Sequence, residues 1–405
     1  MTALRLLALA PFPPRLDATH GGSRAIAELL VRLAERHRIA LLTLRGDDEP
    51  PLDGALAARC EITREIARPG RLAGGLTGDL RVGVALAGGT PMWVSRWSVP
   101  AFRRAAAEVG TVWRPDVVQA EYHVMAQYLT AVPGRPARVL RQLEPGAATA
   151  AERGKIRPGL ARAVTSLDRW AWRRYESRAM RQADVVATLT ERDRATLAPL
   201  AGHTPLVVIP LGVPLPERPA DPCGRSPRTV IFVGNYVHPP NVDAAERLMA
   251  SVFPLVRRAV PDAALRIVGP GPGSGLLAMA VDGVTVTGEV ANVWDQLEDA
   301  AVVIAPLRFG GGMRVKVAEA LAAGKAVVAT SLAAEGLDVR DGDQIMLAET
   351  DAELAEAVIT LLRSPERRAE LAVRARVWAL SALGWERPVA AYETLYRRVL
   401  GDARP

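Results

Sequence analysis

The stretch RFGGGMRVKVAEALAAGKAVVATSLAAEGL, from Arg308 to Leu337, combines a triple-glycine turn, a helical pattern, an apolar strand and a second turn. The run before it, residues 301–305, is short, apolar and β-branched, as expected of a buried parallel strand, and Pro306 ends it. A loop must follow, in which Gly310, Gly311 and Gly312 allow positive φ and a close approach to a ligand. The stretch therefore predicts a strand, loop, helix and strand of a parallel α/β sheet.

Two cations and a carboxylate follow these glycines. Arg314 and Lys316 stand at the predicted start of the helix, where free N–H groups and the helix dipole already favour an anion. Glu319 lies three residues after Lys316 and shares its helical face, where a carboxylate is suited to hold vicinal hydroxyls. With Glu335 in the next loop, this set predicts a nucleotide-sugar site, and a plain βαβ unit with a glycine-rich turn is the alternative.

Length and composition indicate a two-domain α/β protein. The chain has 405 residues, enough for two domains of about 200 residues each, and is 49% hydrophobic but only 5% aromatic. Its net charge of +7 fits arginine used as a general surface residue, or attraction to an anionic membrane surface or phosphorylated ligands. A nucleic-acid partner is not expected, because no helix-turn-helix, zinc-finger or RNP-like pattern accompanies the arginines.

The cysteines and the first residues indicate a cytoplasmic protein. Cys60 and Cys223 are far apart and belong to no C-x-x-C pair, so neither a metal site nor a disulfide framework is predicted. Pro11, Pro13 and Pro14 interrupt the N-terminal apolar run before it could serve as a signal sequence. No uninterrupted apolar run reaches the length of about 18 residues that a membrane span requires.

Strand and helix signals alternate twice along the chain. The first α/β domain is predicted in residues 1–212, with a glycine pair, Gly21 and Gly22, in the loop after its first strand. Residues 213–228 carry five prolines and form the predicted linker. Predicted strands lie at 4–10, 39–44, 115–120, 138–142, 184–188, 206–210, 229–234, 264–268, 284–287, 301–305 and 325–330. Predicted helices lie at 24–36, 242–258, 353–362, 365–378 and 385–399.

Three segments of the second half resemble the donor domain of glycosyltransferase family 4. They are FVGNYVHPPNVDA at 232–244, VTVTGEVANV at 284–293, and residues 306–337. Weaker similarity to the family covers the runs at 115–122, 181–193 and 207–213. The resemblance implies an α/β fold of the GT-B type, in which two Rossmann-like domains face each other across a cleft. It assigns residues 1–212 to the acceptor-binding domain and 229–384 to the donor domain. Residues 385–405 hold a terminal helix, and the sequence leaves open whether this helix packs on the N-terminal domain.

The same resemblance implies roles for individual residues. It assigns Arg314 and Lys316 to the donor diphosphate, as catalytic groups, and Glu319 to the ribose hydroxyls. His238 faces the cleft or is a solvated loop histidine. The donor site implied in full is Gly21, Gly22, Gly234, Asn235, His238, Gly288, Glu289, Val290, Gly310, Gly311, Gly312, Met313, Arg314, Lys316 and Glu319.

Two positions depart from the pattern of the family. Gly311 stands where many members have a glutamate that holds the transferred sugar, so the identity of that sugar stays open. No histidine follows the predicted strand at 138–142, where many members carry one in the acceptor domain. Glu144 is the candidate catalytic replacement, as a polar contact or proton acceptor, with a turn residue as the alternative.

The function implied is a retaining, metal-independent hexosyltransferase without a cofactor. It would move a hexose-type sugar from a UDP- or GDP-linked donor to a hydroxyl of a glycan, glycolipid or natural product, in polysaccharide or natural-product biosynthesis. The cations replace Mg²⁺, and Asp341-Gly342-Asp343, which has the letters of a metal-binding motif, reads as a turn. The acceptor and the oligomeric state stay open.

Three alternatives and one surface feature remain. A catalytically silent sugar-nucleotide-binding protein is favoured by Gly311, whereas a sugar-nucleotide epimerase lacks an evident pair of acid–base residues. A nicotinamide-dependent enzyme lacks a G-x-G-x-x-G motif after the first strand. The segment from Arg153 to Arg181, with Trp170, Trp172 and Tyr175, is either a basic patch for peripheral contact with the inner membrane face or interior packing.

Overall fold

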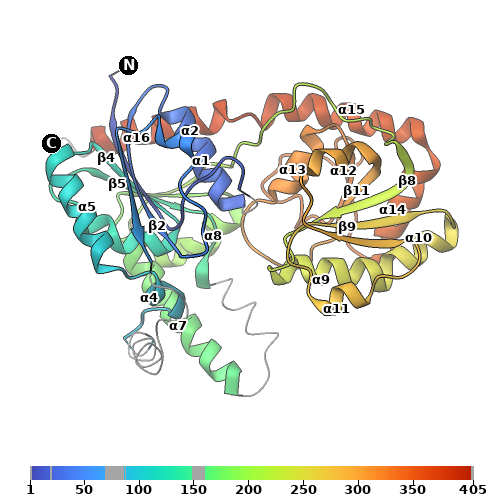
Figure 1. Ribbon diagram of the computed structural model, residues 1–405, viewed down its shortest axis with the longest axis horizontal. Helices are drawn as coiled ribbons and strands as arrows, with labels where there is room; N and C mark the ends of the chain where they lie inside the picture. The colour runs from blue at the N-terminus through green and yellow to red at the C-terminus, as the bar shows by residue number, and fades with distance from the viewer. Residues whose placement is uncertain (1, 19–20, 69–85, 87, 148–159, 403–405) are drawn as a thin grey trace. The chain divides into compact units, whose positions relative to one another are not determined.

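The computed structural model describes residues 2–18, 21–68, 86, 88–147 and 160–402 (Figure 1). These residues form two compact units. Unit 1 comprises Met1–Pro210 and Pro388–Pro405, and unit 2 comprises Leu211–Arg387. Each unit contains one parallel sheet covered by helices, as the alternating pattern predicts.

Unit 1 is built on a parallel sheet of seven strands in the order β3-β2-β1-β4-β5-β6-β7. The order reverses between β1 and β4, which opens a crevice at the carboxyl ends of these strands. The strands are β1 Arg5–Ala10, β2 Arg38–Arg45, β3 Ile62–Ala67, β4 Val117–Glu121, β5 Ala137–Gln142, β6 Val185–Thr188 and β7 Leu206–Val208. The helices are α1 Gly21–Leu33, α2 Gly54–Ala57, α4 Met92–Arg96, α5 Pro100–Trp113, η1 His123–Ala131, α7 Leu160–Met180, α8 Glu191–Ala201 and α16 Glu386–Asp402.

Unit 2 is built on a second parallel sheet, in the order β10-β9-β8-β11-β12-β13. Here the order reverses between β8 and β11. The strands are β8 Ser226–Val233, β9 Ala264–Val268, β10 Val284–Gly288, β11 Ala300–Ala305, β12 Ala326–Ala329 and β13 Met346–Leu347. The helices are α9 Pro239–Arg247, η2 Leu248–Val252, α10 Phe253–Ala259, α11 Ser274–Ala278, α12 Val293–Asp299, α13 Val315–Ala322, α14 Asp351–Arg363 and α15 Pro365–Ala382.

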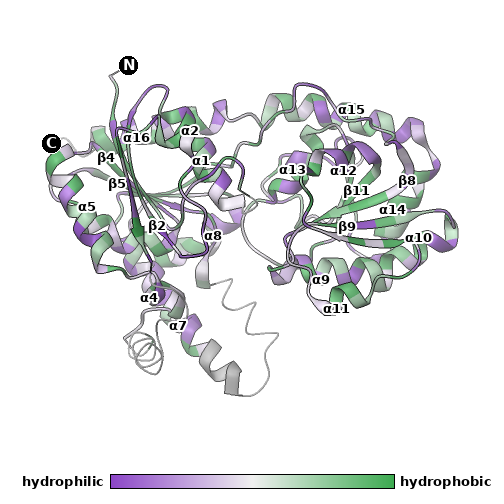
Figure 2. Cartoon of the chain, in the orientation of Figure 1, coloured by the Kyte–Doolittle hydropathy of each residue, from purple (hydrophilic) through white to green (hydrophobic). Residues whose placement is uncertain are grey.

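The central strands are apolar on both faces because helices cover both sides of each sheet. Every residue of β11 is buried, and so is every residue of β12. Figure 2 shows the hydrophobic strands in the interior of each unit, with the polar residues on the outer helix faces. Burial on both faces explains why these strands read as continuous apolar runs rather than as alternating patterns.

The structure corrects four details of the predicted elements. The short strands β3 and β13 were not predicted, because Ile62–Ala67 is largely exposed and charged and Met346–Leu347 has two residues. Helix α1 begins at Gly21, so the glycine pair forms its first turn rather than the preceding loop. Strand β8 begins at Ser226, inside the predicted linker.

The long helix predicted at 242–258 is interrupted. Helix α9 ends at Arg247, a π-helical turn occupies Leu248–Val252, and α10 follows. Pro254 stands in the first turn of α10 and has no amide proton to donate, which fits a change of hydrogen-bond pattern just before it.

The terminal helix α16 packs on unit 1 through buried polar contacts, a position that the sequence left open. The Arg141 guanidinium pairs with Glu121 at 3.0 Å, and both side chains are almost wholly buried. The Gln119 amide donates to Glu121 at 2.7 Å, and the Tyr396 hydroxyl of α16 donates to Gln119 at 2.6 Å. The Tyr392 ring lies 5.6 Å from the guanidinium carbon of Arg141. A buried network thus joins β4, β5 and α16.

Glu121→Ala should destabilise unit 1 strongly, because it leaves the Arg141 guanidinium buried without its carboxylate. We expect the free energy of unfolding to fall by about 3 kcal/mol or more, measured by urea denaturation. Replacing both partners by methionine should recover most of that loss.

Glu108→Ala is the matched control for this prediction. Glu108 forms an exposed ion pair with Arg64 at 2.8 Å in the same unit. Its loss should cost less than about 1 kcal/mol. Equal destabilisation by the two single variants would contradict the role given to the buried pair.

Candidate functional site

The strongest candidate site lies in unit 2, where the loops after β8 and β11 meet. Gly310 in the second loop has a φ of 122°, which favours glycine. A Cβ built on it would stand 3.3 Å from Pro240 Cγ at the start of α9 and 3.0 Å from Arg314 Nη2. The two loops therefore pack closely at the reversal of strand order, the place where open parallel sheets bind ligands.

The loop after β8 is a tight turn that ends in the N-terminus of α9. The Asn235 side-chain oxygen accepts a hydrogen bond from Val237 N at 3.1 Å. The main-chain carbonyl of Asn235 accepts one from the Asn241 side-chain amide at 2.8 Å. His238 is exposed and is the N-cap residue of α9. The main chain at Gly269 packs directly against Gly234. A Cβ on Gly269 would stand 1.8 Å from the Gly234 carbonyl oxygen, so position 269 requires glycine.

The loop after β11 leads directly into α13. Gly312 has a φ of 72°, and Arg314 is the N-cap residue of the helix rather than part of its first turn. The Arg314 guanidinium turns back and donates to the carbonyls of Gly311 and, at 2.7 Å, of Gly312. Arg314 therefore shapes the glycine loop, and its predicted contact with a diphosphate stays a prediction.

Lys316 and Glu319 lie on the same face of α13, as the spacing predicts. Both side chains are half-buried, whereas Val317 and Ala318 between them pack into the core. Lys316 is the second residue of the helix, so it belongs to the first turn, where the helix dipole favours an anion. This helix end brings together a cation, backbone donors and, one turn later, a carboxylate.

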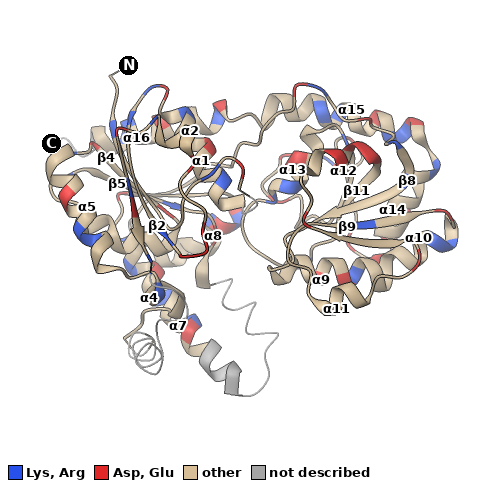
Figure 3. Cartoon of the chain, in the orientation of Figure 1, with Lys and Arg blue, Asp and Glu red and all other residues tan. Residues whose placement is uncertain are grey.

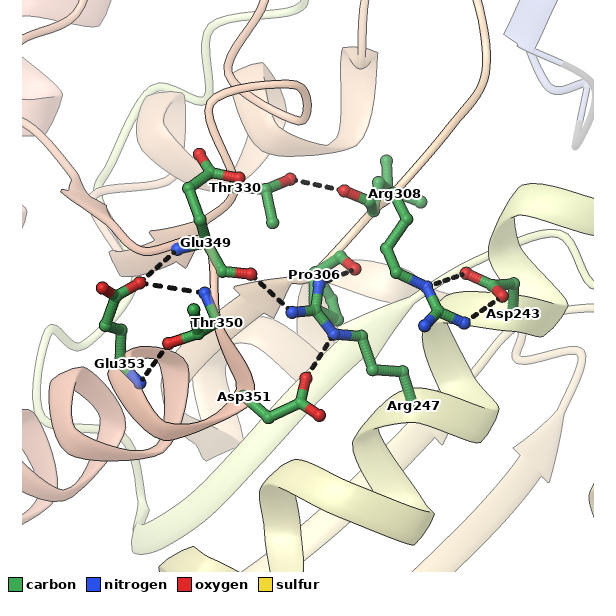
Figure 4. Close-up of polar contacts among 10 residues, drawn as sticks. Asp243, Arg247, Pro306, Arg308, Thr330, Glu349, Thr350, Asp351 and Glu353 are labelled. Carbon is green, nitrogen blue, oxygen red and sulfur yellow. Dashed lines mark hydrogen bonds and ion pairs between the residues drawn. The ribbon is translucent and has the colours of Figure 1, made fainter.

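A polar cluster that was not predicted fixes the base of the glycine loop. Arg247 is buried at the end of α9 and donates to the carbonyls of Pro306 at 3.0 Å and Glu349 at 2.6 Å. Its guanidinium also pairs with Asp351 at 2.6 Å, and Figure 4 shows it between these three partners. Arg247 therefore fixes the main chain at Pro306, where the loop that leads to Lys316 begins.

Two further contacts hold the same loop. The Thr330 hydroxyl donates to the Leu307 carbonyl at 2.7 Å, and Arg308 pairs bidentately with Asp243 of α9 (Figure 4). These residues escaped prediction because each is an ordinary surface-type residue in sequence, and only the fold brings them together.

The remaining predicted positions of unit 2 are the end of β10, the buried Met313 and the turn at residues 341–343. The Gly288 carbonyl, at the end of β10, accepts a hydrogen bond from Gly269 N at 2.9 Å, so this loop adjoins the one after β9. Glu289 is exposed, Val290 is half-buried and Met313 is buried. Asp341-Gly342-Asp343 forms a turn, as predicted, with Gly342 at a φ of 73°.

Gly21 and Gly22 belong to unit 1 and begin α1 at the reversal of strand order there. A Cβ built on Gly21 would meet nothing within 4 Å among the described residues, so packing against them does not require glycine at this position. The Ser23 hydroxyl donates to the Pro13 carbonyl at 2.9 Å and fixes the loop before the helix. The contact of this glycine pair with a donor bound to unit 2 remains a prediction.

A histidine that was not predicted lies close to the candidate Glu144. His123 follows β4 and is fully buried, with its ring 4.7 Å from Trp172 and 5.2 Å from Trp93. Burial lowers the pKa of His123 to about 3, and a polar contact with the Glu144 backbone opposes that shift only in part. The imidazole is therefore neutral at neutral pH and supports the position of the loop. In sequence it stands in an apolar run that reads as core.

A buried carboxylate anchors the loop that carries Glu144. Glu176 of α7 accepts hydrogen bonds from Gly146 N at 2.7 Å, Ala147 N at 3.2 Å and the Gln142 amide at 2.7 Å. Burial raises the pKa of Glu176 to about 7, and these three donors oppose the rise. The loop after β5 therefore depends on α7 for its conformation.

Glu176 should make the stability of unit 1 depend on pH. Its pKa of about 7 in the folded chain lies above the ordinary value of 4.5, so its contribution is fully present below about pH 4.5 and is lost as the pH rises through about 7. Between about pH 5 and pH 8 the wild type should lose about 2 kcal/mol more than Glu176→Gln in urea denaturation. Glu191→Gln, an exposed change on α8, should keep the wild-type slope, and an unchanged slope in Glu176→Gln would contradict the assignment.

No group of three or more His, Cys, Asp or Glu side chains among the described residues is placed to hold a metal ion. None of the helices formed by these residues is both long enough and apolar enough to cross a membrane.

Comparison with known proteins places unit 2 in a family. Residues 227–364 match the family described as Glycosyl transferases group 1. The phosphatidyl-myo-inositol mannosyltransferase of Mycolicibacterium smegmatis is 35% identical over 158 residues, which are 37% of this chain and 40% of that protein. Across the curated relatives that it matches, the chain spans between 40% and 49% of their length.

Solved structures extend the likeness to nearly the whole chain. Sucrose-phosphate synthase of Thermosynechococcus elongatus matches with a TM-score of 0.74 at 16% identity, over 98% of this chain and all of that one. HepE of Anabaena, in complex with UDP, matches with a TM-score of 0.65 at 14% identity, over 97% and 99% of the two chains. The predicted α/β fold of the GT-B type is confirmed. Residues 227–364 match the group 1 glycosyltransferases, and the predicted resemblance to glycosyltransferase family 4 is confirmed.

Proposed function

We propose that the chain is a retaining glycosyltransferase that moves a hexose from a nucleoside-diphosphate sugar to an acceptor hydroxyl. The observation that supports this most is the start of α13. There Lys316 stands in the first turn of the helix, at the reversal of strand order in unit 2, where the positive end of the helix dipole favours an anion. The group 1 family match covers this same helix.

The chemistry that this helix end can perform is stabilisation of a leaving group. A nucleoside diphosphate departs with growing negative charge on its phosphate oxygens, and fixed cations and N–H dipoles lower the energy of that state. Lys316 supplies the charge, Arg314 holds the loop in shape and Glu319 is placed one turn away for the ribose hydroxyls. In this proposal the departing phosphate also helps to take the proton from the acceptor, and no metal or cofactor takes part.

The sugar end of the site is less polar than the phosphate end. Gly311 offers only its backbone, and its carbonyl already accepts from Arg314. The transferred hexose would therefore be held by backbone N–H groups of this loop or by another side chain, and Glu144 stays the acceptor-side candidate. This difference concerns the choice of sugar rather than the binding of the diphosphate.

Relatives support the proposed substrates. HepE has been solved with UDP and glucose, which supports a UDP-linked donor, and a GDP-linked donor stays open. The curated relatives are named phosphatidyl-myo-inositol mannosyltransferases, which supports a hexose donor and a lipid-linked acceptor. We accordingly propose a cytoplasmic protein in peripheral contact with the inner membrane face.

A second candidate function is binding of a sugar nucleotide without turnover. It is favoured by Gly311, which replaces a glutamate typical of the family, and by the lack of a histidine after β5. The two candidates share the diphosphate site and differ only in whether a glycosidic bond breaks.

Lys316→Ala should weaken the binding of UDP or GDP by about 10- to 100-fold, because a charged hydrogen bond to phosphate is lost. Isothermal calorimetry measures this change, and the temperature of unfolding without nucleotide should hardly move. Arg258→Ala is the matched control, since Arg258 is an exposed cation in the last turn of α10, in the same unit. Unchanged affinity in Lys316→Ala would exclude the proposed diphosphate site.

Turnover separates the two candidate functions. Incubated with a panel of UDP- and GDP-sugars, the wild type should release the free nucleotide slowly even without an acceptor, because water can take the place of the acceptor hydroxyl. Chromatography of the nucleotide measures that release, and Lys316→Ala should lower it in parallel with binding. Tight binding of a donor with neither hydrolysis nor transfer would support the silent alternative.

A further inference from the structure

One side of helix α7 in unit 1, together with Arg181 just after its end, presents four arginines along a surface hollow. The described residues that line this hollow are Ser166, Arg169, Trp170, Arg173, Arg174, Ser177 and Arg181. Their spacing of three and four residues places them on one face of the helix, which we call the arginine face. Helix α7 runs beside α4 (Figure 3).

The positive charge of the arginine face is not neutralised by the carboxylates of its own helix. Asp168 accepts a hydrogen bond from Met92 N at 3.0 Å, and Glu176 is buried against the loop after β5. Within the described part of the chain, no carboxylate forms an ion pair with the four arginines. Elsewhere in unit 1 exposed arginines have such partners, for example Arg38 with Glu61 and Arg194 with Glu191. The arginine face is therefore a concentration of positive charge that a multivalent anion could neutralise.

An apolar side chain, Trp170, lies within the arginine face, and Leu167 stands one turn before it on α7. Trp170 is 47% exposed and Leu167 is 45% exposed, and the Arg174 guanidinium carbon lies 5.9 Å from the Trp170 ring. Exposed tryptophan beside arginine is typical of helices that lie in the boundary between lipid headgroups and acyl chains. A soluble phosphate or a nucleic-acid backbone would neutralise the arginines but would leave Leu167 in water.

We propose that the arginine face binds the phosphate groups of an anionic lipid surface, with Trp170 and Leu167 entering its apolar boundary. Guanidinium groups suit this task because they donate two parallel hydrogen bonds to a phosphate and are only weakly hydrated. The proposal concerns binding alone and requires no catalysis.

The other side of the same helix contacts the loop after β5, which carries Glu144. Trp172 packs against His123, and Glu176 holds the backbone of Gly146 and Ala147. A lipid surface bound to the arginine face would therefore lie on the helix that fixes the loop carrying Glu144. This link, which rests on the proposed function, favours an acceptor presented by the lipid surface over one in solution.

The test is flotation of the full chain with vesicles, without donor or acceptor. Wild type should float with vesicles of phosphatidylcholine and phosphatidylglycerol but not with phosphatidylcholine alone, and added salt should weaken binding to the anionic vesicles. Arg169→Gln with Arg173→Gln should lower the partition coefficient about 30-fold, at about fivefold for each arginine near an anionic surface. Trp170→Ala should lower it further without changing the salt dependence.

The matched control removes the same charge from another face of unit 1. Arg104→Gln with Arg135→Gln changes two exposed arginines and should leave the partition coefficient within about twofold of wild type. Circular dichroism and thermal unfolding confirm that each variant folds.

Three outcomes would overturn the proposal. They are absence of wild-type binding to anionic vesicles, equal loss of binding in the two double variants, and wild-type binding to an RNA oligonucleotide but not to vesicles. Calorimetry with UDP tests the diphosphate site separately, so a failure of lipid binding can be distinguished from a failure of the proposed function.

Discussion

A parallel sheet whose strand order reverses imposes one constraint on which the rest of this structure depends. The two strands beside the reversal send their following helices to opposite faces of the sheet, so no helix covers the gap between their loops. Both sheets of this chain have such a reversal, between β1 and β4 and between β8 and β11. The candidate donor residues in the loops after β8 and β11, the glycine pair of α1 and the buried His123 all follow strands beside these two reversals. The candidates from Gly288 to Val290 instead follow the edge strand β10. The chemistry of the chain is thus located by its connectivity before any side chain is considered.

Residues near each other in sequence were predicted well, and residues joined only by the fold were not. The apolar runs of β9 and β11, the glycine loop and the shared face of Lys316 and Glu319 depend on spacing, which the sequence displays. Arg247 and Asp351 are 104 positions apart and meet only because α9 and α14 pack on the same sheet. The spacing of residues along the sequence does not predict a contact over so many positions. The polar cluster at the base of the glycine loop therefore could not be predicted.

A similar limit explains the errors at element ends and the reading of α7. Gly21 looked like part of a loop because glycine disfavours helices, yet it occupies the first turn, where its cost is small. In α7 the aromatic residues divide between two sides: Trp172 and Tyr175 are buried, whereas Trp170 is exposed. The alternatives of interior packing and surface patch, which the sequence left open, are therefore both realised on one helix. Residues 153–159 of the predicted patch lie outside the described residues.

The packing of α16 on unit 1 also has a consequence for the order of biosynthesis. The buried pair of Arg141 and Glu121 receives Tyr392 and Tyr396 from a helix that follows all of unit 2 in the chain. While the ribosome is still making unit 2, the strands of the first sheet have been synthesised but helix α16, which packs on that sheet, has not. Gln119 then lacks its hydrogen-bond partner Tyr396. Unit 1 therefore reaches its final packing only after the second unit has been synthesised, although it is the first to leave the ribosome.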